Sequence, residues 1–591
     1  MWKNLGERAD RFARLAFEFD ASLSNVMNPF VLRASDHPFT TLLMKPLLLA
    51  LASIAFLFAS QLQTSATPPS RVKPRDIRPE RELLITHPSV VDSEFAKYPG
   101  PWSFGALVEE IFSKETARDV VRDWLEQHAL STGVGTKLRT PGWDDPATQW
   151  LALQNQTIAA AAVTAWTAHT GIPARPAIWR KVIDPWQARD GYNPAEGKPW
   201  SPNFANAPFR LLAIVNRVDL AAPELVDLQT PVENLWRLRG LHKEFTRMTS
   251  LATGTPFSDL FTRRGGGGYP GTLNGTTNSD AAGEGRLVFG AVGIDGRPLE
   301  GGWTLIFEYN LLRDQATTLP GFSSETLPNS PPISAGRLWA DIWHRLGDYE
   351  FVDHRYNEML AQVTRAFTHK RERIVCKQVQ VDGSGFAQLR TNEGAFGRDR
   401  IFRQFEVREG KFAPAVLPMT PGVHFMEKTR DGGQLLASFL KSTEPLILAG
   451  MHSLPEHAPG SGHLRPFHAD HAVIPAGQTD FHWDPDQRIS RNARRLFSLA
   501  TCNGCHGADT GCPDGLHVHP RSEGVASKLS DFLRTDGRAN RFRDPGVKTA
   551  FVKQEEMKDR ATIMAALLEP RERRRINTLE DLLRERLRRG H

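Results

Sequence analysis

FRLLAIVNRVDL, the stretch from residue 209 to residue 220, gives the first indication of this chain's architecture. Its apolar side chains follow one another almost without interruption, as they do in buried β-strands. Two similar runs come later, GRLVFGAVG at 285–293 and WTLIFEYNL at 303–311. Together the three runs predict a strand-rich centre.

Helical spacing of apolar residues flanks this centre on both sides. A helix is predicted to begin after Ser103, which can cap it, and to continue through Leu125. Further helices are expected at 157–171 and 334–369, and strand-like segments then run to LILAG at 446–450. We therefore expect residues 84–480 to form a mixed α/β (α+β) region, possibly two domains.

Composition sets broad limits on the class of protein. The chain has 591 residues, which suggests two to four domains. Its 73 basic and 67 acidic residues give a net charge of +6, and this balance gives no reason to expect a nucleic-acid partner. Four cysteines are too few for a disulfide framework.

The N-terminal residues indicate export. Residues 44–66 begin with Met-Lys, continue with an apolar run too short to span a membrane comfortably, and end in small residues, as secretory signal peptides do. Residues 1–43 are then a non-native extension before the true start at Met44, or a short cytosolic tail before a signal anchor. Residues 67–83 are predicted to be a linker. The expected location is periplasmic or otherwise extracytoplasmic, with membrane association only if the signal is uncleaved.

TCNGCHG, residues 501–507, holds the strongest chemical motif. Two thiols three positions apart on a helical turn, Cys502 and Cys505, can each bond to one vinyl group of haem. His506, directly after the second cysteine, can bind the iron from the proximal side. The spacing therefore predicts covalent haem.

A helix is predicted before the motif, capped by Ser490, and another at 577–589, capped by Asn577. With the motif between them, residues 486–591 resemble a c-type cytochrome domain. The resemblance implies a small all-α domain carrying one haem c per chain, attached outside the cytoplasm. The strand-rich middle is also similar to uncharacterised exported bacterial proteins that end in a CxxCH segment.

Two other uses of the motif remain open. Cys502, Cys505, His506 and Cys512 supply four zinc-type ligands within eleven residues, although the adjacent Cys505 and His506 would have difficulty reaching one ion. A redox disulfide is the other. If haem is bound, Cys512 is spare and can pair with Cys376 in an oxidising compartment.

The sixth iron ligand has several candidates. Met564 and Met557 lie near the distance from His506 at which cytochrome domains place a methionine, but they can equally be core residues. His517, with His519, better suits a place beside the proximal ligand. Six histidines also crowd 452–482, and five-coordinate iron is a further possibility.

Charged and polar residues interrupt the predicted strands. We expect them to form a polar site, a set of paired buried ions, or strand ends at the surface: Asn216, Arg217, Asp219, Glu284, Arg286 and Glu308.

These features favour an extracytoplasmic electron-transfer haem protein. Its partner would be a redox protein or a small-molecule electron donor or acceptor. The alternatives are an oxidoreductase with a second active site in the large region, and a non-haem envelope binding or scaffold protein. No dinucleotide fingerprint or HExxH motif is present, and the glycine run at 262–280 lacks the ending of a phosphate loop. Catalytic residues are not identified.

Overall fold

We describe the fold from a computed structural model of the chain. The structure describes residues 73, 76–134, 177–218, 281–312, 319, 335–369, 371–375, 378–382, 385–426, 431–448, 452, 454–455, 457–458, 466–476, 483, 488–507, 510, 512, 514–534, 540–543, 551–554 and 556–568. All of them belong to one compact unit, residues 72–591.

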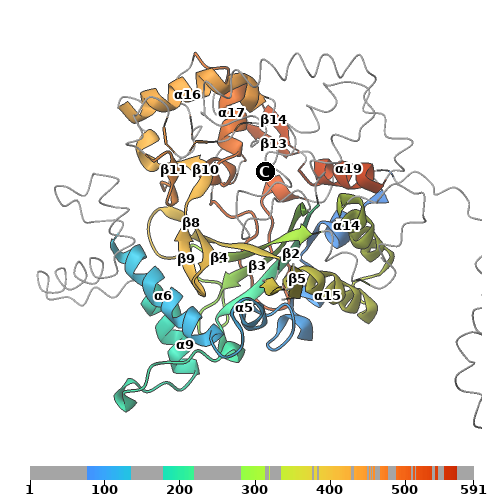
Figure 1. Cartoon of the computed structure of the whole chain (residues 1–591), viewed down its shortest axis with the longest axis vertical. Helices are drawn as coiled ribbons and strands as arrows, with labels where there is room; N and C mark the ends of the chain where they lie inside the picture. The colour runs from blue at the N-terminus through green and yellow to red at the C-terminus, as the bar shows by residue number, and fades with distance from the viewer. Residues whose placement is uncertain are drawn as a thin grey trace, which may run out of the picture. The chain divides into compact units, whose positions relative to one another are not determined.

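An eight-stranded antiparallel sheet with surrounding helices forms the centre of this unit (Figure 1). Its strand order is β1-β2-β3-β4-β7-β8-β12, and β9 pairs with β8. The strands are β1 (Leu84–Ile85), β2 (Phe209–Val218), β3 (Ala281–Ala291), β4 (Trp303–Leu312), β7 (Phe386–Glu393), β8 (Arg400–Arg408), β9 (Lys411–Ala415) and β12 (Ala472–Ile474). The predicted mixed α/β class and the three predicted strands are confirmed.

The remaining elements are shorter strand pairs and helices. The strand pairs are β5 (Arg371–Val375) with β6 (Gln378–Asp382), β10 (Leu417–Pro421) with β11 (His468–Ala469), and β13 (Asn540–Arg543) with β14 (Phe551–Gln554). The helices are α3 (Pro79–Glu82), α4 (Pro88–Val91), α5 (Phe104–Phe112), α6 (Ala117–Val134), α9 (Asp184–Arg189), α14 (Ala335–His344), α15 (His354–Thr368), α16 (Asp431–Leu448), α17 (Arg491–Leu499), α18 (Cys502–Cys505) and α19 (Glu556–Leu568).

One face of the sheet is apolar and packs against helices. Phe104 of α5 contacts Phe289 of β3 and Phe307 of β4, with ring centroids 6.3 and 5.9 Å apart. Trp124 of α6 contacts Phe405 of β8 at 5.7 Å. Successive side chains of a strand point to opposite faces of the sheet. The other face therefore holds the alternate residues of β3, β4 and β8, next in sequence to those of the apolar face.

That other face is polar, and it is nevertheless buried. We call it the polar face, and the register aligns its members across five strands: Arg217, Glu284, Arg286, Glu308, Gln388, Arg390, Asn392 and Gln404. An antiparallel sheet commonly leaves its polar side to water. Here Glu308 and Asn392 are buried, and Gly290 and Gly302 of this side lie against Pro520 and Leu516. The C-terminal segment therefore covers the sheet where solvent would otherwise lie.

Three helix and strand predictions were wrong in detail. The helix capped by Ser103, which accepts a hydrogen bond from the Ala106 amide, ends at Phe112, because Ser113 has a φ of 81°. The helix expected at 334–369 is two helices, α14 and α15, and Asp353 caps the second. The strand expected at LILAG is wrong, since α16 continues to Leu448.

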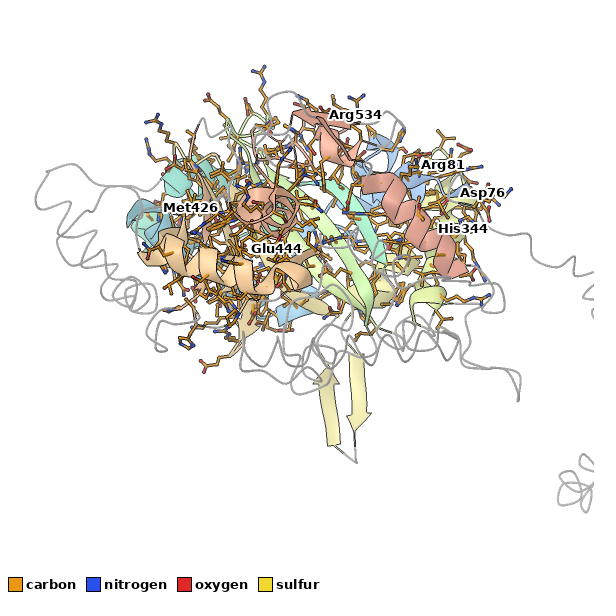
Figure 2. All side chains as sticks on the ribbon, turned by 90° about the horizontal axis from the view of Figure 1, so that it is seen from above. Asp76, Arg81, His344, Met426, Glu444 and Arg534 are labelled. Atoms are coloured by element: carbon orange, nitrogen blue, oxygen red, sulfur yellow. The ribbon has the colours of Figure 1, made fainter. Side chains whose placement is uncertain are left out.

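The segment expected to be a linker is partly structured. Pro79–Glu82 forms α3, and Ile77 and Leu83 are buried in the core. The Glu82 carboxylate lies 2.8 Å from Nδ1 of His344 of α14. His344 is labelled in Figure 2. The last third of 67–83 therefore belongs to the folded unit.

The division expected between 480 and 486 does not coincide with a gap in packing. Arg521 forms a two-pronged ion pair with Asp92, with both contacts at 2.7 Å, and Ser527 donates to the Leu212 carbonyl. The described C-terminal residues also include the β13–β14 pair. Whether residues 486–591 resemble a cytochrome domain stays a prediction.

Several predictions fall outside the described residues. They are the extension and signal at 1–66, the helices at 157–171 and 577–589, the glycine run at 262–280, Asp219 and Cys376.

Candidate functional site

The cysteine motif begins where two helices meet. Ser490 caps α17 by accepting a hydrogen bond from the Ala493 amide, as predicted. Thr501 caps α18, and its side chain accepts from the Gly504 amide. A Cβ atom on Gly504 would lie 2.1 Å from the Ser498 carbonyl oxygen, so the turn requires glycine there. This close approach places Cys502 and Cys505 on one helical turn.

Hydrogen bonds from Trp483 and from β10 hold the turn in place. The indole N–H of Trp483, which is buried, lies 2.9 Å from Thr501 Oγ1 and 3.1 Å from Asn503 Oδ1. The Cys502 amide donates to Thr420 Oγ1 of β10 at 3.0 Å. Glu444 of α16 accepts from the Ser490 amide and so joins α16 to the start of α17 (Figure 2).

His506 is oriented by a backbone carbonyl. Its Nδ1 atom lies 3.0 Å from the Gly515 oxygen, which also accepts a hydrogen bond from Asn392 Nδ2 of the polar face at 2.7 Å. Gly515 has a φ of +69°, and a Cβ there would lie 2.3 Å from Arg400 Cδ. A histidine that donates one ring nitrogen to a carbonyl presents the other to a metal. Here that other atom is Nε2.

His517 lies beside His506, with ring centroids 4.4 Å apart. Its Nε2 atom is 3.0 Å from the Cys505 carbonyl oxygen and 3.6 Å from Cys505 Sγ, and its Nδ1 atom is 2.8 Å from Ser530 Oγ. Both ring nitrogens are thus engaged near the motif. His517 therefore lies beside His506, and its role as a candidate sixth ligand or as a neighbour of the proximal ligand stays a prediction.

An apolar wall lies next to the motif. Cys502 packs against a small cluster of buried residues from β8, β10, β11 and β12: Phe402, Leu417, Ala469, Ala472 and Ile474. The Phe402 ring is 4.8 Å from that of His506. Phe402 and Asn392 pair in register between β8 and β7, so the sheet itself supports both the wall and the His506 loop.

Burial changes the protonation of the motif. Desolvation raises the pKa of the Cys502 thiol, and it raises that of Cys505 to about 12. Burial, reinforced by His517, holds the pKa of His506 well below its usual range. The thiols are therefore protonated and poor nucleophiles, whereas the imidazole is neutral, the form that binds metals.

The zinc alternative does not fit the geometry. No three His, Cys, Asp or Glu side chains in the described part of the chain converge closely enough to hold a metal ion. Cys502, Cys505, His506 and Cys512 all lie in that part. Cys512 is a buried free thiol.

The methionine candidates are both buried in the main core. Met564 Sδ lies 4.0 Å from Asn216 Nδ2, whereas Met557 follows Glu556 at the start of α19. Of the crowded histidines, His468 contacts the Leu454 carbonyl and His471 pairs with Asp470, while His463 and His482 lie outside the described residues. The structure brings none of these side chains to the Nε2 side of His506 by a contact that it describes.

The charged strand residues pair with one another. Arg286 lies 2.6 Å from Glu284 and 3.1 Å from Glu308, and Arg217 lies 3.6 Å from Glu284. Arg390, which the sequence interpretation missed, lies 3.4 Å from Glu308. Only the fold places Arg390 in this set, because its strand joins the sheet through long-range pairing.

Comparisons with known proteins gave no match. No family model, no curated protein and no solved structure is significantly similar to this chain.

Proposed function

We propose that the protein is an extracytoplasmic c-type haem protein that acts in electron transfer. Cys502 and Cys505 would form the thioether bonds, and His506 Nε2 would bind the iron. The observation that carries the proposal is the contact of His506 Nδ1 with the Gly515 oxygen, because it orients Nε2 as a ligand. Within this proposal, residues 486–591 form the cytochrome-like part.

The surroundings support a macrocycle rather than a bare metal ion. One wall beside Cys502 is apolar, the two thiols share one turn, and the ligands of a zinc site do not converge. Bound haem would supply one-electron transfer. The protein's residues would hold it, orient His506 through Gly515, and limit the access of water.

The location and partners belong to the same proposal. The signal-like residues 44–66 and the need to attach haem outside the cytoplasm support export. Within the described ranges, every helix is too short or too polar to cross a membrane. The partner would be a redox protein or a small-molecule electron donor or acceptor.

Denaturing gels with a haem-peroxidase stain test the proposal. In an export host that attaches haem, the wild type and Cys512→Ala should stain, because Cys512 is not part of the motif. The double variant Cys502→Ala, Cys505→Ala should lose the stain completely. An unstained wild-type band from folded, exported protein would contradict the proposal, as would a stained double variant.

A further inference from the structure

Arginine and glutamate side chains form an ion-pair cluster on the polar face, which we call the arginine cluster. It contains three guanidinium groups and two carboxylates: Arg217, Arg286, Arg390, Glu284 and Glu308. The carboxylates are the more enclosed members, with side chains 6% and 1% exposed. Arg560 and Glu556 of α19 also act electrostatically on Arg217, so the cluster extends to that helix.

Arg217 is the member with spare hydrogen-bonding capacity. Its nearest partner is Glu284 at 3.6 Å, and its guanidinium makes no hydrogen bond with any residue that the structure describes. Desolvation, together with Arg286 and Arg560, lowers its pKa to about 10. Yet the side chain keeps 16% of its surface exposed. A guanidinium has five N–H donors, so Arg217 can donate to an anion while it stays near Glu284.

The cluster lies beside the cysteine motif. Arg390 is two residues from Asn392 on the same face of β7, a spacing of roughly 7 Å, and Asn392 shares the Gly515 oxygen with His506. Burial raises the pKa of both thiols, and arginines of the cluster partly offset this: Arg390 lowers the pKa of Cys502, and Arg217 and Arg286 lower that of Cys505. The polar face therefore extends from the residues beside the motif to the arginine cluster.

We propose that the polar face is the second half of the haem site, and that Arg217 binds a propionate carboxylate of the haem there. The inference rests on the proposed function. Haem carries its only anionic groups, two propionates, on the edge away from the vinyl groups that bond to cysteine. Arg–carboxylate pairs are charge-assisted and can be bidentate, which suits a donor with no other hydrogen bond. The sheet would thus bind one edge of the cofactor and the C-terminal segment the other.

The test uses the full exported protein with haem labelled with carbon-13 in its propionate carboxyl groups. Infrared difference spectra between the oxidised and reduced states then report the labelled carboxylates directly. Arg217→Gln should retain covalent haem in the gel stain and should shift the labelled carboxylate bands. Arg217→Lys keeps the charge but not the bidentate geometry, so it should shift the labelled carboxylate bands less. If Arg217→Gln does not fold, Arg217→Lys replaces it in this test.

Arg560→Gln is the matched control. Arg560 of α19 pairs with Glu556 at 2.8 Å and acts electrostatically on Arg217, but it lies outside the polar face. At one fixed ambient potential, both variants should lower the ratio of reduced to oxidised haem several-fold, because each removes a nearby positive charge. Only the Arg217 variants should shift the carboxylate bands.

Each outcome decides between the two proposals. Unchanged bands in Arg217→Gln, or an equal shift in Arg560→Gln, would overturn the propionate assignment and leave the haem proposal standing. A wild type without covalent haem would overturn both.

Discussion

Replacing Glu393 with glutamine is expected to lower the free energy of unfolding by about 3–5 kcal/mol at pH 7. Glu393 ends β7 with its side chain 1% exposed, and its carboxylate lies 3.0 Å from His128 Nε2 of α6 and 3.4 Å from Arg403 Nε. Thr391 donates a further hydrogen bond. Glutamine removes the charge and leaves the buried Arg403 guanidinium without its carboxylate partner, and removing one partner of a buried ion pair is strongly destabilising.

The same residue predicts how stability depends on pH. Burial alone would raise the pKa of Glu393, but His128 and Arg403, with hydrogen bonds from His128 and Thr391, lower it to about 2. Because the pKa is lower in the folded state, the contribution of the carboxylate to stability is present above about pH 4.5 and is lost as the pH falls toward 2. The wild type should therefore lose up to about 3 kcal/mol over this range relative to the variant.

Urea unfolding midpoints of both proteins at several pH values check this prediction. Glu406→Gln is the control, since Glu406 pairs only at the surface, with Arg408 at 3.0 Å, and should change stability by less than about 1 kcal/mol. A difference between Glu393→Gln and the wild type that stays constant from pH 7 to pH 3 would contradict the assigned pKa.

The strands of the sheet could be predicted where a single stretch of sequence carries a strong strand pattern. The runs at 209–220, 285–293 and 303–311 are long, apolar and rich in strand-forming residues, so they predicted β2, β3 and β4. LILAG failed because a short apolar run cannot by itself distinguish a buried strand from the end of a buried helix. The break between α14 and α15 had a signal, Asp353, which caps α15.

Of the candidate site, only the residues that are neighbours in the sequence could be predicted. Spacing alone selected Cys502, Cys505 and His506, because the chemistry needs these types side by side in the chain. Asn392, Phe402 and Gly515 reach His506 through strand pairing and a loop that returns to the sheet. The interruption of apolar strands by charge did suggest a polar site. The sequence could not show that the C-terminal segment covers that face.

Replacing Gly504 with alanine is expected to lower the free energy of unfolding by about 3 kcal/mol, near the upper end for overpacking. The added Cβ would lie 2.1 Å from the Ser498 carbonyl oxygen and 2.6 Å from its carbonyl carbon. Backbone atoms at the end of α17 cannot rotate away as a side chain can. The α17–α18 junction must therefore open, and Cys502 and Cys505 must separate from their present turn.

Two measurements follow this change, the denaturant midpoint and the intensity of the haem stain. Gly397→Ala is the matched control, because its added Cβ would have no neighbour closer than 3.8 Å, and it should change stability by less than about 0.5 kcal/mol. If Gly504→Ala lowers both stability and haem attachment, the turn geometry sets the spacing of the two thiols for the cofactor. Lower stability with full haem attachment would show that attachment tolerates a displaced turn, and the role of Gly504 would then be confined to packing.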